Sequence, residues 1–423
     1  MLCPRTVLTA LCVLAIPAWC AASDDDVLTG DPLKLETVVA YAQQHNSEIH
    51  AGAARWRAAE ARPSQAGALP DPMVELAYHN ERFDRITFGE SDFAFVKLGA
   101  SQEVPFPGKL GLKHDIAAHE AEQSHAELRR LELDVIRRVK MAYADYAHLD
   151  ELLDILHRNR ALLQNFARIA EAKYAVGQGI QQDVLKAHVE LSLLVDRETI
   201  LAQRRQSQTA ELNALLNRPS SAPLGKAEHP MERSLTRSLE DLMSAAQAQA
   251  PELQVVRWQV EREDAALALA HREYLPDFVV RADYMNKDGL DPEWEVGLGI
   301  KVPLYFAVKQ RAGVAEAAAA LQRARAERTG TSRSIESRVQ DLYARAKASE
   351  QLVALYHTTV LPQAHLALDS ANAAYQVGKI DFLTLLNSFT VMLEYEMRYH
   401  EELANFQKAA AELEATVGEP VEE

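Results

Sequence analysis

The chain has 423 residues and a formal net charge of −16, from 61 acidic and 45 basic side chains. This acidic excess argues against binding to nucleic acid, because phosphate contacts need clustered cations. The length would suit two or three ordinary domains. No apolar run of about 18 residues follows residue 22, which argues against transmembrane helices.

The N-terminus has the pattern of a secretion signal. Arg5 is followed by a short apolar stretch from Val7 to Ala18, and small residues then predict cleavage near Ala22. Cleavage there removes all three cysteines, which suits an exported protein without disulfides. Lipidation of Cys20 is the alternative, although Trp19 is bulkier than the residue that lipoprotein signals place before their cysteine.

The rest of the chain is an internal duplication. Tyr174-Ala-Val176-Gly177 recurs 201 positions later as Tyr375-Gln-Val377-Gly378, and the register persists to Pro219 and Pro420. A single repeat of this size indicates two similar halves of one unit and not a solenoid. The expected organisation is a signal peptide over 1–22, a first repeat over 23–219, a linker over 220–238, a second repeat over 239–418 and a tail over 419–423.

Each repeat opens with a predicted helical segment, from Leu35 to about Ala68 and from Leu239 to about Tyr274. Both segments end at a matched Leu-Pro-Asp, at residues 69–71 and 275–277. Proline stops a helix and makes the residue before it extended, so both breakers separate the opening helices from the next segments of the chain.

Two segments of alternating polarity come next in each repeat and predict strands at about 72–80 and 92–104, then at about 277–285 and 293–303. Each has about the length of a tilted strand that crosses a bilayer. A small periplasmic sheet with one solvated face is the alternative. Four strands cannot close a barrel, and open edges are not tolerated in lipid, so a membrane location would require several chains to share one barrel.

The remainder of each repeat is predicted to be a long helical hairpin, over 109–217 and 311–417. Between Lys109 and Tyr174 there is no proline and a single glycine, and helix-forming residues dominate. A helix of about 60 residues extends about 90 Å. Such hairpins need neighbours to bury their apolar stripes.

Several short motifs occur in a fixed order along the first repeat. They are Asn46-Ser47-Glu48-Ile49, Leu69-Pro70-Asp71-Pro72, Ser101-Gln102-Glu103-Val104-Pro105 and Pro107-Gly108-Lys109. Together with the doubled Tyr-x-Val-Gly turn, which is the most specific of them, they make the chain resemble the outer-membrane efflux factor family, the TolC-like channel-tunnels. The resemblance extends over nearly all of Leu35 to Val417.

The resemblance implies a fold that is mainly α with transmembrane β, built by a homotrimer. Each protomer would add four strands to a shared 12-stranded barrel in outer-membrane lipid, and the long hairpins would form a periplasmic tunnel. Three chains with four strands each would leave no edge in lipid. The polar segments Glu81–Ser91 and Lys287–Pro292 would be extracellular loops. The joints between strands and helices are expected at Pro105, Pro107, Gly108 and Pro303.

By the same resemblance, the two glycine turns would lie at the periplasmic tip, where the family docks an adaptor protein and closes like an iris. The need to reverse a helical hairpin accounts for the glycines by itself, so docking is implied by the resemblance alone. The expected docking residues are Tyr174, Val176, Gly177, Gly179, Tyr375, Val377, Gly378 and Lys379.

The candidate gate residues are Asp183, Ile380, Asp381, Thr384 and Asn387. Thr384 and Asn387 stand where well-known relatives carry acidic residues, and Ile380 stands where they carry a basic one. The resemblance therefore leaves two kinds of gate open. One is held by ion pairs, and the other by apolar contacts around Ile380 and Phe382.

The expected function is a passive exit duct of a tripartite efflux pump, which works with a periplasmic adaptor and an inner-membrane pump of the RND type. The motifs around Pro105 resemble those of the branch of the family that serves heavy-metal pumps, and an acidic tunnel favours cations over anions. Heavy-metal cations are therefore the expected cargo. Drugs or other small molecules are the alternative cargo, and a soluble periplasmic coiled-coil scaffold is the alternative function.

No enzyme motif is present, and no cofactor or bound metal is expected. Glu396, Met397 and His400 share a helix face with ligand types that suit copper or silver. Ordinary packing on a partly exposed helix also explains them.

Overall fold

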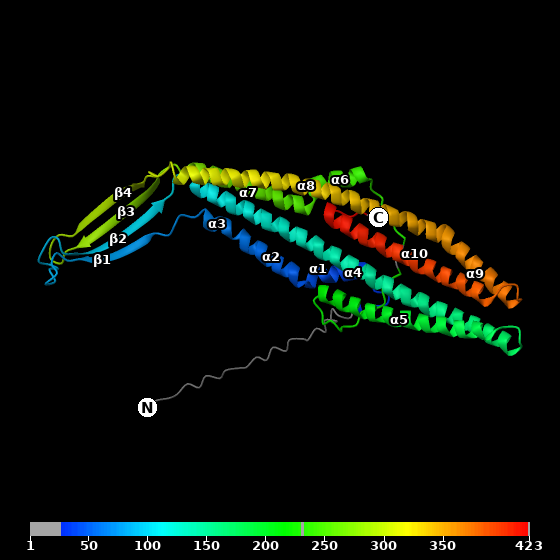
Figure 1. Cartoon of the computed structure of the whole chain (residues 1–423). Helices are drawn as coiled ribbons and strands as arrows, with labels where there is room; N and C mark the ends of the chain where they lie inside the picture. The colour runs from blue at the N-terminus through cyan, green and yellow to red at the C-terminus, as the bar shows by residue number, and fades with distance from the viewer. Residues whose placement is uncertain (1–26, 230–231, 422–423) are drawn as a thin grey trace, which may run out of the picture.

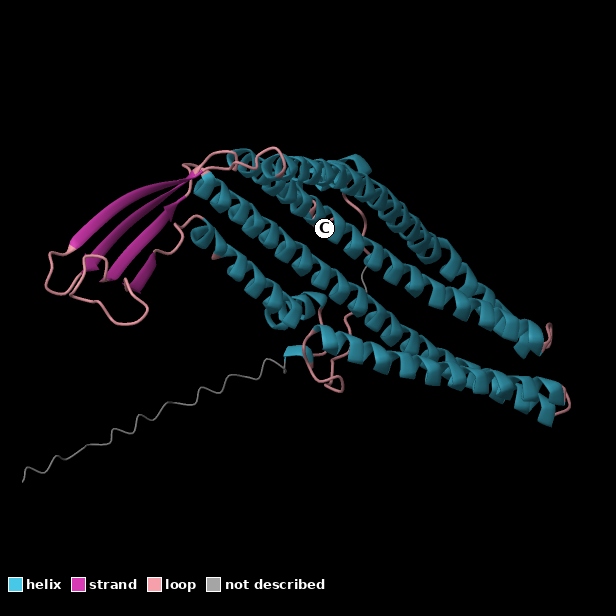
Figure 2. Ribbon diagram, turned by 60° about the vertical axis from the view of Figure 1, so that its left-hand side comes forward, coloured by secondary structure: helices cyan, strands magenta, loops and turns pink. Residues whose placement is uncertain are grey.

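The computed structural model describes residues 27–229 and 232–421. The predicted signal peptide with Cys20 and part of the predicted linker and tail lie outside this range. The molecule is elongated, with a sheet at one end and long helices that run from it to the other end (Figures 1 and 2). Within the described residues, no helix combines the length and the apolar character needed to cross a membrane.

Each repeat consists of short opening helices, two strands and a long helical hairpin, in that order. In the first, these are α1 (Leu35–His45), α2 (Ser47–Glu60), α3 (Arg62–Ala66), β1 (Met73–His79), β2 (Phe95–Val104), α4 (Lys109–Ala175) and α5 (Gln181–Leu215). In the second, they are α6 (Leu239–Gln249), α7 (Pro251–Arg272), β3 (Asp277–Asn286), β4 (Glu293–Lys301), α8 (Lys309–Leu355), the π-helix η2 (Tyr356–Val360), α9 (Leu361–Gln376) and α10 (Phe382–Val417). With 67 residues, α4 extends about 100 Å.

The opening segment of the first repeat is not one helix, because Asn46 interrupts it. The backbone of Asn46 is extended, and its side-chain oxygen accepts hydrogen bonds from the N–H groups of Glu48 (2.9 Å) and Ile49 (3.2 Å). A side chain that caps free N–H groups in this way starts a new helix. The Asn46 amide also donates to the carbonyl oxygen of Leu215 at the end of α5 (2.8 Å). The Asn46 motif therefore ties the start of the repeat to its end.

In the second repeat, Gly330 does not interrupt the long helix, since α8 continues through it. The interruption lies at η2, directly before Pro362. Proline has no N–H to donate, and its ring crowds the carbonyl four residues earlier, which is that of Thr358 inside η2. The wider π-helical turn accommodates this crowding and leaves a local irregularity in the helix.

The four strands form one antiparallel sheet in the order β1-β2-β3-β4. The register places Leu76, Leu98, Tyr284 and Trp294 in one row across the sheet, and all four side chains are exposed in the single chain. The adjacent row is Glu75, Gly99, Asp283 and Glu295. Because neighbouring residues of a strand point to opposite faces, one face of the sheet is apolar and the other is charged.

The joint between β2 and α4 is fastened to the second repeat by a buried lysine. Lys109 is only 2% exposed, and its ammonium group donates to the Leu275 carbonyl (2.9 Å) and to Asp277 Oδ1 (2.9 Å). The same carboxylate oxygen accepts from the backbone N–H of Phe106 (2.8 Å). A buried ammonium group is tolerated only when it is paired and hydrogen-bonded, so this contact fixes the two repeats relative to each other.

Gly108 precedes Lys109 with φ of +91°, a conformation that glycine adopts without strain. A Cβ at this position would also collide with the Arg272 guanidinium group, which donates to the Pro107 carbonyl (2.8 Å). At the second joint, after Pro303, no described side chain takes the place that Arg272 has at the first joint. Its apolar side chains are exposed in the single chain; they are Leu304, Tyr305, Phe306 and Val308.

The helices bury three larger apolar clusters instead of one central core. One lies where α1 packs on α4 and α5, and one where α6 packs on α8 and α10. The third joins the two hairpins far from the sheet, where the rings of Phe166 and Phe389 meet edge to face with centroids 6.0 Å apart. The two hairpins of one chain therefore end at the same place, side by side (Figure 1).

Candidate functional site

The two glycine turns lie together at the end of the molecule that is opposite the sheet (Figure 1). Gly177 and Gly378 have φ of +73° and +76°. In the first turn, Gly177 N–H donates to the Tyr174 carbonyl (3.0 Å) and Gln178 N–H to the Lys173 carbonyl (2.8 Å); the second turn repeats this pattern. Both are Schellman motifs, which end a helix with a left-handed residue. The duplicated sequence therefore gives duplicated geometry.

The helix after the second turn is capped by Asp381. Its Oδ1 accepts from the backbone N–H of Thr384 (2.8 Å) and from the Thr384 hydroxyl (2.6 Å). These two hydrogen bonds lower the pKa of Asp381. Thr384 thus serves the cap of α10, while Asn387 is exposed and Ile380 is half-buried against the apolar cluster of the two hairpins.

Lys173, which was not singled out in the sequence, connects the two turns. Its ammonium group donates to the Tyr375 carbonyl (2.7 Å) and lies 4.8 Å from the centre of the Tyr375 ring. Tyr375 is only 4% exposed and packs on the fully buried Phe382, with ring centroids 5.5 Å apart. Tyr375 and Phe382 therefore support the tip from inside one chain, and the surface is left to Tyr174, Val176 and Val377.

The tip also brings two carboxylates of different hairpins near each other. Burial raises the pKa of Asp183, and the charge of Asp381 raises it further, while Lys186 opposes the shift. The Asp183 charge in turn adds to the burial that raises the pKa of Tyr375. Asp183 and Asp381 thus form an acidic pair at the tip. The pKa of Asp183 is raised, whereas that of Asp381 is lowered.

A second group of contacts lies halfway along the molecule, where the linker crosses the helices (Figure 1). We call its described residues, 220–229 and 232–238, the strap. The strap forms a parallel bridge to the start of the chain at Leu33 and Ala227, and α4 receives it with polar side chains. Asp150 accepts from the Ala227 N–H (3.1 Å), and the Tyr146 hydroxyl donates to the Gly225 carbonyl (2.9 Å). Lys226 pairs with Asp154.

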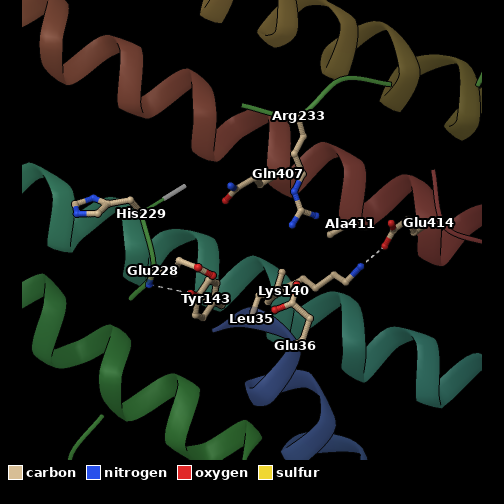
Figure 3. Close-up of a pocket in the computed structure, with 10 residues that line it drawn as sticks. All are labelled: Leu35, Glu36, Lys140, Tyr143, Glu228, His229, Arg233, Gln407, Ala411 and Glu414. Carbon is tan, nitrogen blue, oxygen red and sulfur yellow. Dashed lines mark hydrogen bonds and ion pairs between the residues drawn. The ribbon is translucent and has the colours of Figure 1, made fainter. Parts of the chain in front are cut away.

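The strap forms one wall of a pocket between α4 and α10 (Figure 3). The Tyr143 hydroxyl accepts from the Glu228 N–H (3.2 Å) and donates to the Leu33 carbonyl (2.6 Å). Lys140 of α4 pairs with Glu414 of α10 across the other side. These contacts connect the strap, the first repeat and the last helix, so the pocket marks a structural junction.

Further along, two carboxylates connect the strap with the helices: Glu151 with α4 and α10, and Glu232 with the second repeat. Glu151 of α4 lies 2.7 Å from His229 Nδ1 and 3.9 Å from His400 Nε2 of α10. Glu232 accepts from the Tyr399 hydroxyl (2.7 Å) and lies 2.6 Å from His357 Nδ1 of η2. The strap therefore reaches the irregular turn η2 as well as α10.

Beside this junction lies a histidine that resists protonation. Burial lowers the pKa of His148 to about 4, with further contributions from Lys408 and His400, and Asp145 opposes the shift. Burial also lowers the pKa of His400. Both rings therefore stay neutral in the folded chain at neutral pH.

The described residues contain no group of three or more histidine, cysteine, aspartate or glutamate side chains that could hold a metal ion. Glu396 is engaged instead by the Asn159 amide (2.8 Å), and His400 faces Glu151. The face shared by Glu396, Met397 and His400 is thus used for packing between helices.

Three comparisons with known proteins bear on the whole chain. A family model described as outer membrane efflux protein matches residues 38–218 and 242–419. The stretch between the two matched parts contains the strap, and the two parts correspond to the two repeats.

Two curated relatives match most of the chain. The cobalt-zinc-cadmium resistance protein CzcC of Cupriavidus metallidurans is 20% identical over 390 residues, which are 92% of this chain and 90% of that protein. The outer membrane efflux protein BepC of Brucella suis is 22% identical over 374 residues, with 86% and 81% covered. Among solved structures, the outer membrane protein VceC of Vibrio cholerae aligns with a TM-score of 0.76 at 20% identity, over 92% of this chain and 96% of that one.

The buried histidine makes a testable contribution to acid sensitivity. His148 has a folded-state pKa below its ordinary value of about 6.5. Between these two pKa values, the unfolded chain binds a proton at His148 and the folded chain does not. Stability is therefore lost as the pH falls from about 6.5 to about 4, by about 2 kcal/mol at about pH 5. His148→Gln should remove this loss, measured as the difference between the unfolding midpoints at about pH 7.5 and about pH 5.

The matched control is His114→Gln, at an exposed histidine of the same helix. An equal acid shift in His148→Gln and the parent would contradict the prediction.

Proposed function

Because the chain belongs to the outer membrane efflux protein family, we propose that three copies of it form one continuous exit duct across the periplasm and the outer membrane. Family members are TolC-like channels in the outer membrane of Gram-negative bacteria, and they work in tripartite pumps with a periplasmic adaptor and an inner-membrane pump. These channels are passive, which confirms the expectation that the chain is not an enzyme. The proposal adds the trimer, the cargo and the docking surface.

The observation that carries the proposed trimer is the sheet. It has four strands, two open edges and one exposed apolar face. A membrane sheet must close, because hydrocarbon has no groups to pair with an open edge. Four strands from each of three chains would close a 12-stranded barrel with the apolar face toward lipid and the charged face toward water.

The helices support the same assembly. In one chain, α5 leaves a row of apolar side chains exposed, and so do α8 and α9. The row on α5 consists of Leu185, Val189, Leu193 and Ile200, and that on α8 and α9 of Leu352, Leu355 and Leu366. Long helices need neighbours to bury such stripes, and adjacent copies around a threefold axis would supply them.

The gate is proposed at the tip, around the acidic pair Asp183 and Asp381. Three copies of each carboxylate would lie around the axis, with Ile380, Thr384 and Asn387 beside them. Because Phe382 is buried within its own chain, an apolar gate would depend on Ile380 alone. The soluble scaffold is set aside, since the family is one of outer-membrane proteins.

A pair of adjacent residues tests the barrel. Val296 lies on the uncharged face of β4, whereas Gly297 faces the other side, where an added Cβ would meet no other atom within 4 Å. Arginine on a lipid face costs about 2–4 kcal/mol at the middle of the bilayer. Val296→Arg should therefore reduce the yield of SDS-resistant, heat-modifiable trimers in outer-membrane fractions, and Gly297→Arg should not.

The parent chain and Gly297→Arg should also give single-channel conductance steps in planar bilayers. Equal trimer yields from both variants would contradict the proposed orientation of the sheet. Recovery of the parent chain as a soluble monomer would contradict the duct.

The cargo is proposed to be a heavy-metal cation, by analogy with the relative named for cobalt, zinc and cadmium resistance and from the net charge of −16. An acidic path raises the local concentration of cations over anions. Deleting the gene in its native host should lower the concentration of cobalt, zinc or cadmium that stops growth, and a plasmid copy should restore it. Unchanged growth with metals, together with sensitivity to lipophilic drugs, would favour the alternative cargo.

The tip is proposed as the adaptor-docking surface, through the exposed side chains Tyr174, Val176, Val377 and Lys379 and the backbone shaped by Gly177, Gly179 and Gly378. Val377 is 69% exposed, so Val377→Asp should leave the fold intact. A buried, unpaired charge costs several kcal/mol in an interface, enough to weaken docking by about ten-fold or more. In cells, the variant should form trimers but fail to restore resistance to the deletion strain.

The matched control is Val27→Asp, at a valine that is 56% exposed and lies near α1. It should restore resistance fully. Full resistance with Val377→Asp would refute a docking role for this turn.

A further inference from the structure

The charged face of the sheet carries nine aspartate, glutamate, lysine and arginine side chains, and the opposite face carries none of these four residue types. The six acidic ones are Glu75, Glu103, Asp277, Asp283, Glu293 and Glu295, and the three basic ones are Lys97, Arg281 and Lys301. In the proposed barrel this face lines the water-filled lumen. An ion in the lumen would respond to those charges that no neighbour within the chain balances.

Three of the six carboxylates have a cationic partner of their own. Asp277 is held by Lys109 at the joint (2.9 Å). Glu293 pairs with Lys287 at the start of the loop (2.6 Å), and Glu103 pairs with Lys301 across the sheet (3.3 Å). Each of these charges is largely neutralised within one chain.

Glu75 and Asp283 share two cations in the middle of the sheet. Lys97 lies 3.6 Å from Glu75 and 3.9 Å from Asp283. Arg281 lies 3.3 Å from Glu75 and 3.6 Å from Asp283. The four side chains form a compact square with no net charge.

The four charged side chains fit together because Gly99 has no side chain. It stands between Glu75 and Asp283 in the register, and a Cβ there would collide with Asp283 Oδ1. That oxygen accepts no hydrogen bond from the described residues, and the Asp283 side chain is only 5% exposed. Its charge is therefore balanced by Lys97 and Arg281 and not by hydrogen-bond donors.

Glu295 completes the same row and differs from the rest. It lies opposite Asp283 on β4, the edge strand of the sheet, and its side chain is exposed. Among the described residues, it is the one carboxylate of the charged face that no basic side chain pairs with.

We propose that Glu295 sets the charge selectivity of the outer-membrane barrel, as a ring of three unpaired carboxylates at the level of the Glu75–Asp283 square. The inference rests on the proposed trimeric duct. Lys97 and Arg281 neutralise the two neighbouring acids, so each chain presents one net negative charge at this level and the trimer presents three. The ring favours cations of any kind over anions and holds none of them, because each chain supplies a single unpaired carboxylate to it; Glu293 of the same strand is paired with Lys287.

Two substitutions should change selectivity in opposite directions. A fixed unit charge about 10 Å from an ion in water changes the local ion concentration about two-fold. Glu295→Gln should therefore lower the potassium-to-chloride permeability ratio about two-fold or more, and Lys97→Gln, which exposes acidic charge, should raise it. The measurement is the reversal potential of single channels in planar bilayers under a potassium chloride gradient. Low salt is used because the Debye length is about 30 Å at 0.01 M.

Conductance at 1 M salt serves as the folding control, since a Debye length of about 3 Å screens the ring and an intact pore should conduct like the parent. Glu240→Gln, the same change at an exposed position of α6, should leave the ratio unchanged. An unchanged ratio in Glu295→Gln, or a ratio that falls only with Asp381→Asn at the tip, would overturn the inference. Absence of any channel from the parent chain would contradict the proposed function itself.

Discussion

The unpaired backbone groups at the two edges of the sheet are the constraint on which the rest of the molecule depends. β1 and β4 each pair on one side only, and hydrocarbon offers no partner for the other side. The proposed trimer satisfies both edges by joining different chains. Once the strands of three chains share one barrel, the helices that leave them must stand next to each other in a ring. The adjacent chain then buries the exposed apolar rows on α5, α8 and α9, so the same trimer that closes the sheet also explains these rows.

A shared barrel also demands that the two repeats of one chain keep a fixed register, since each repeat supplies two strands. Three contacts do this at different heights. Lys109 binds Asp277 where the strands end, the strap joins α4 to α10 and η2 in the middle, and Lys173 binds the Tyr375 carbonyl at the tip. Each contact connects a residue of the first repeat or linker with a residue of the second. The duplication therefore supplies similar halves, and a few polar contacts without a counterpart in the other half make them one unit.

The features that could be predicted from the sequence are those that depend on a local pattern of residues or on a repeated motif. Alternation over about ten residues indicated the strands, and the doubled Val-Gly turns indicated two hairpins that the structure brings side by side. The break at Asn46 was missed because it depends on one side-chain oxygen that replaces a helical hydrogen bond. Pro362 marks an interruption of the helix in the sequence, but the π-helical form of this interruption could not be predicted, because the strain of proline is relieved upstream in residues that carry no signal of their own. The roles of Lys173 and the strap could not be predicted at all, since both depend on partners about 70 to 200 positions away.

The ion pairs on the sheet change how the acidity of the chain is interpreted. On the charged face of the sheet, nearby cations balance five of the six carboxylates. A balanced pair presents only a dipole, whose field fades faster than that of a single charge, whereas an unpaired carboxylate acts over about 8 Å at physiological salt. Net charge is therefore a coarse guide to the sign of the ions that a duct of this kind prefers, and the positions of its few unpaired carboxylates are a finer one. A weak preference is also what a passive duct needs, because transport is driven from the inner membrane. A site that bound its cargo tightly would hold it back from leaving.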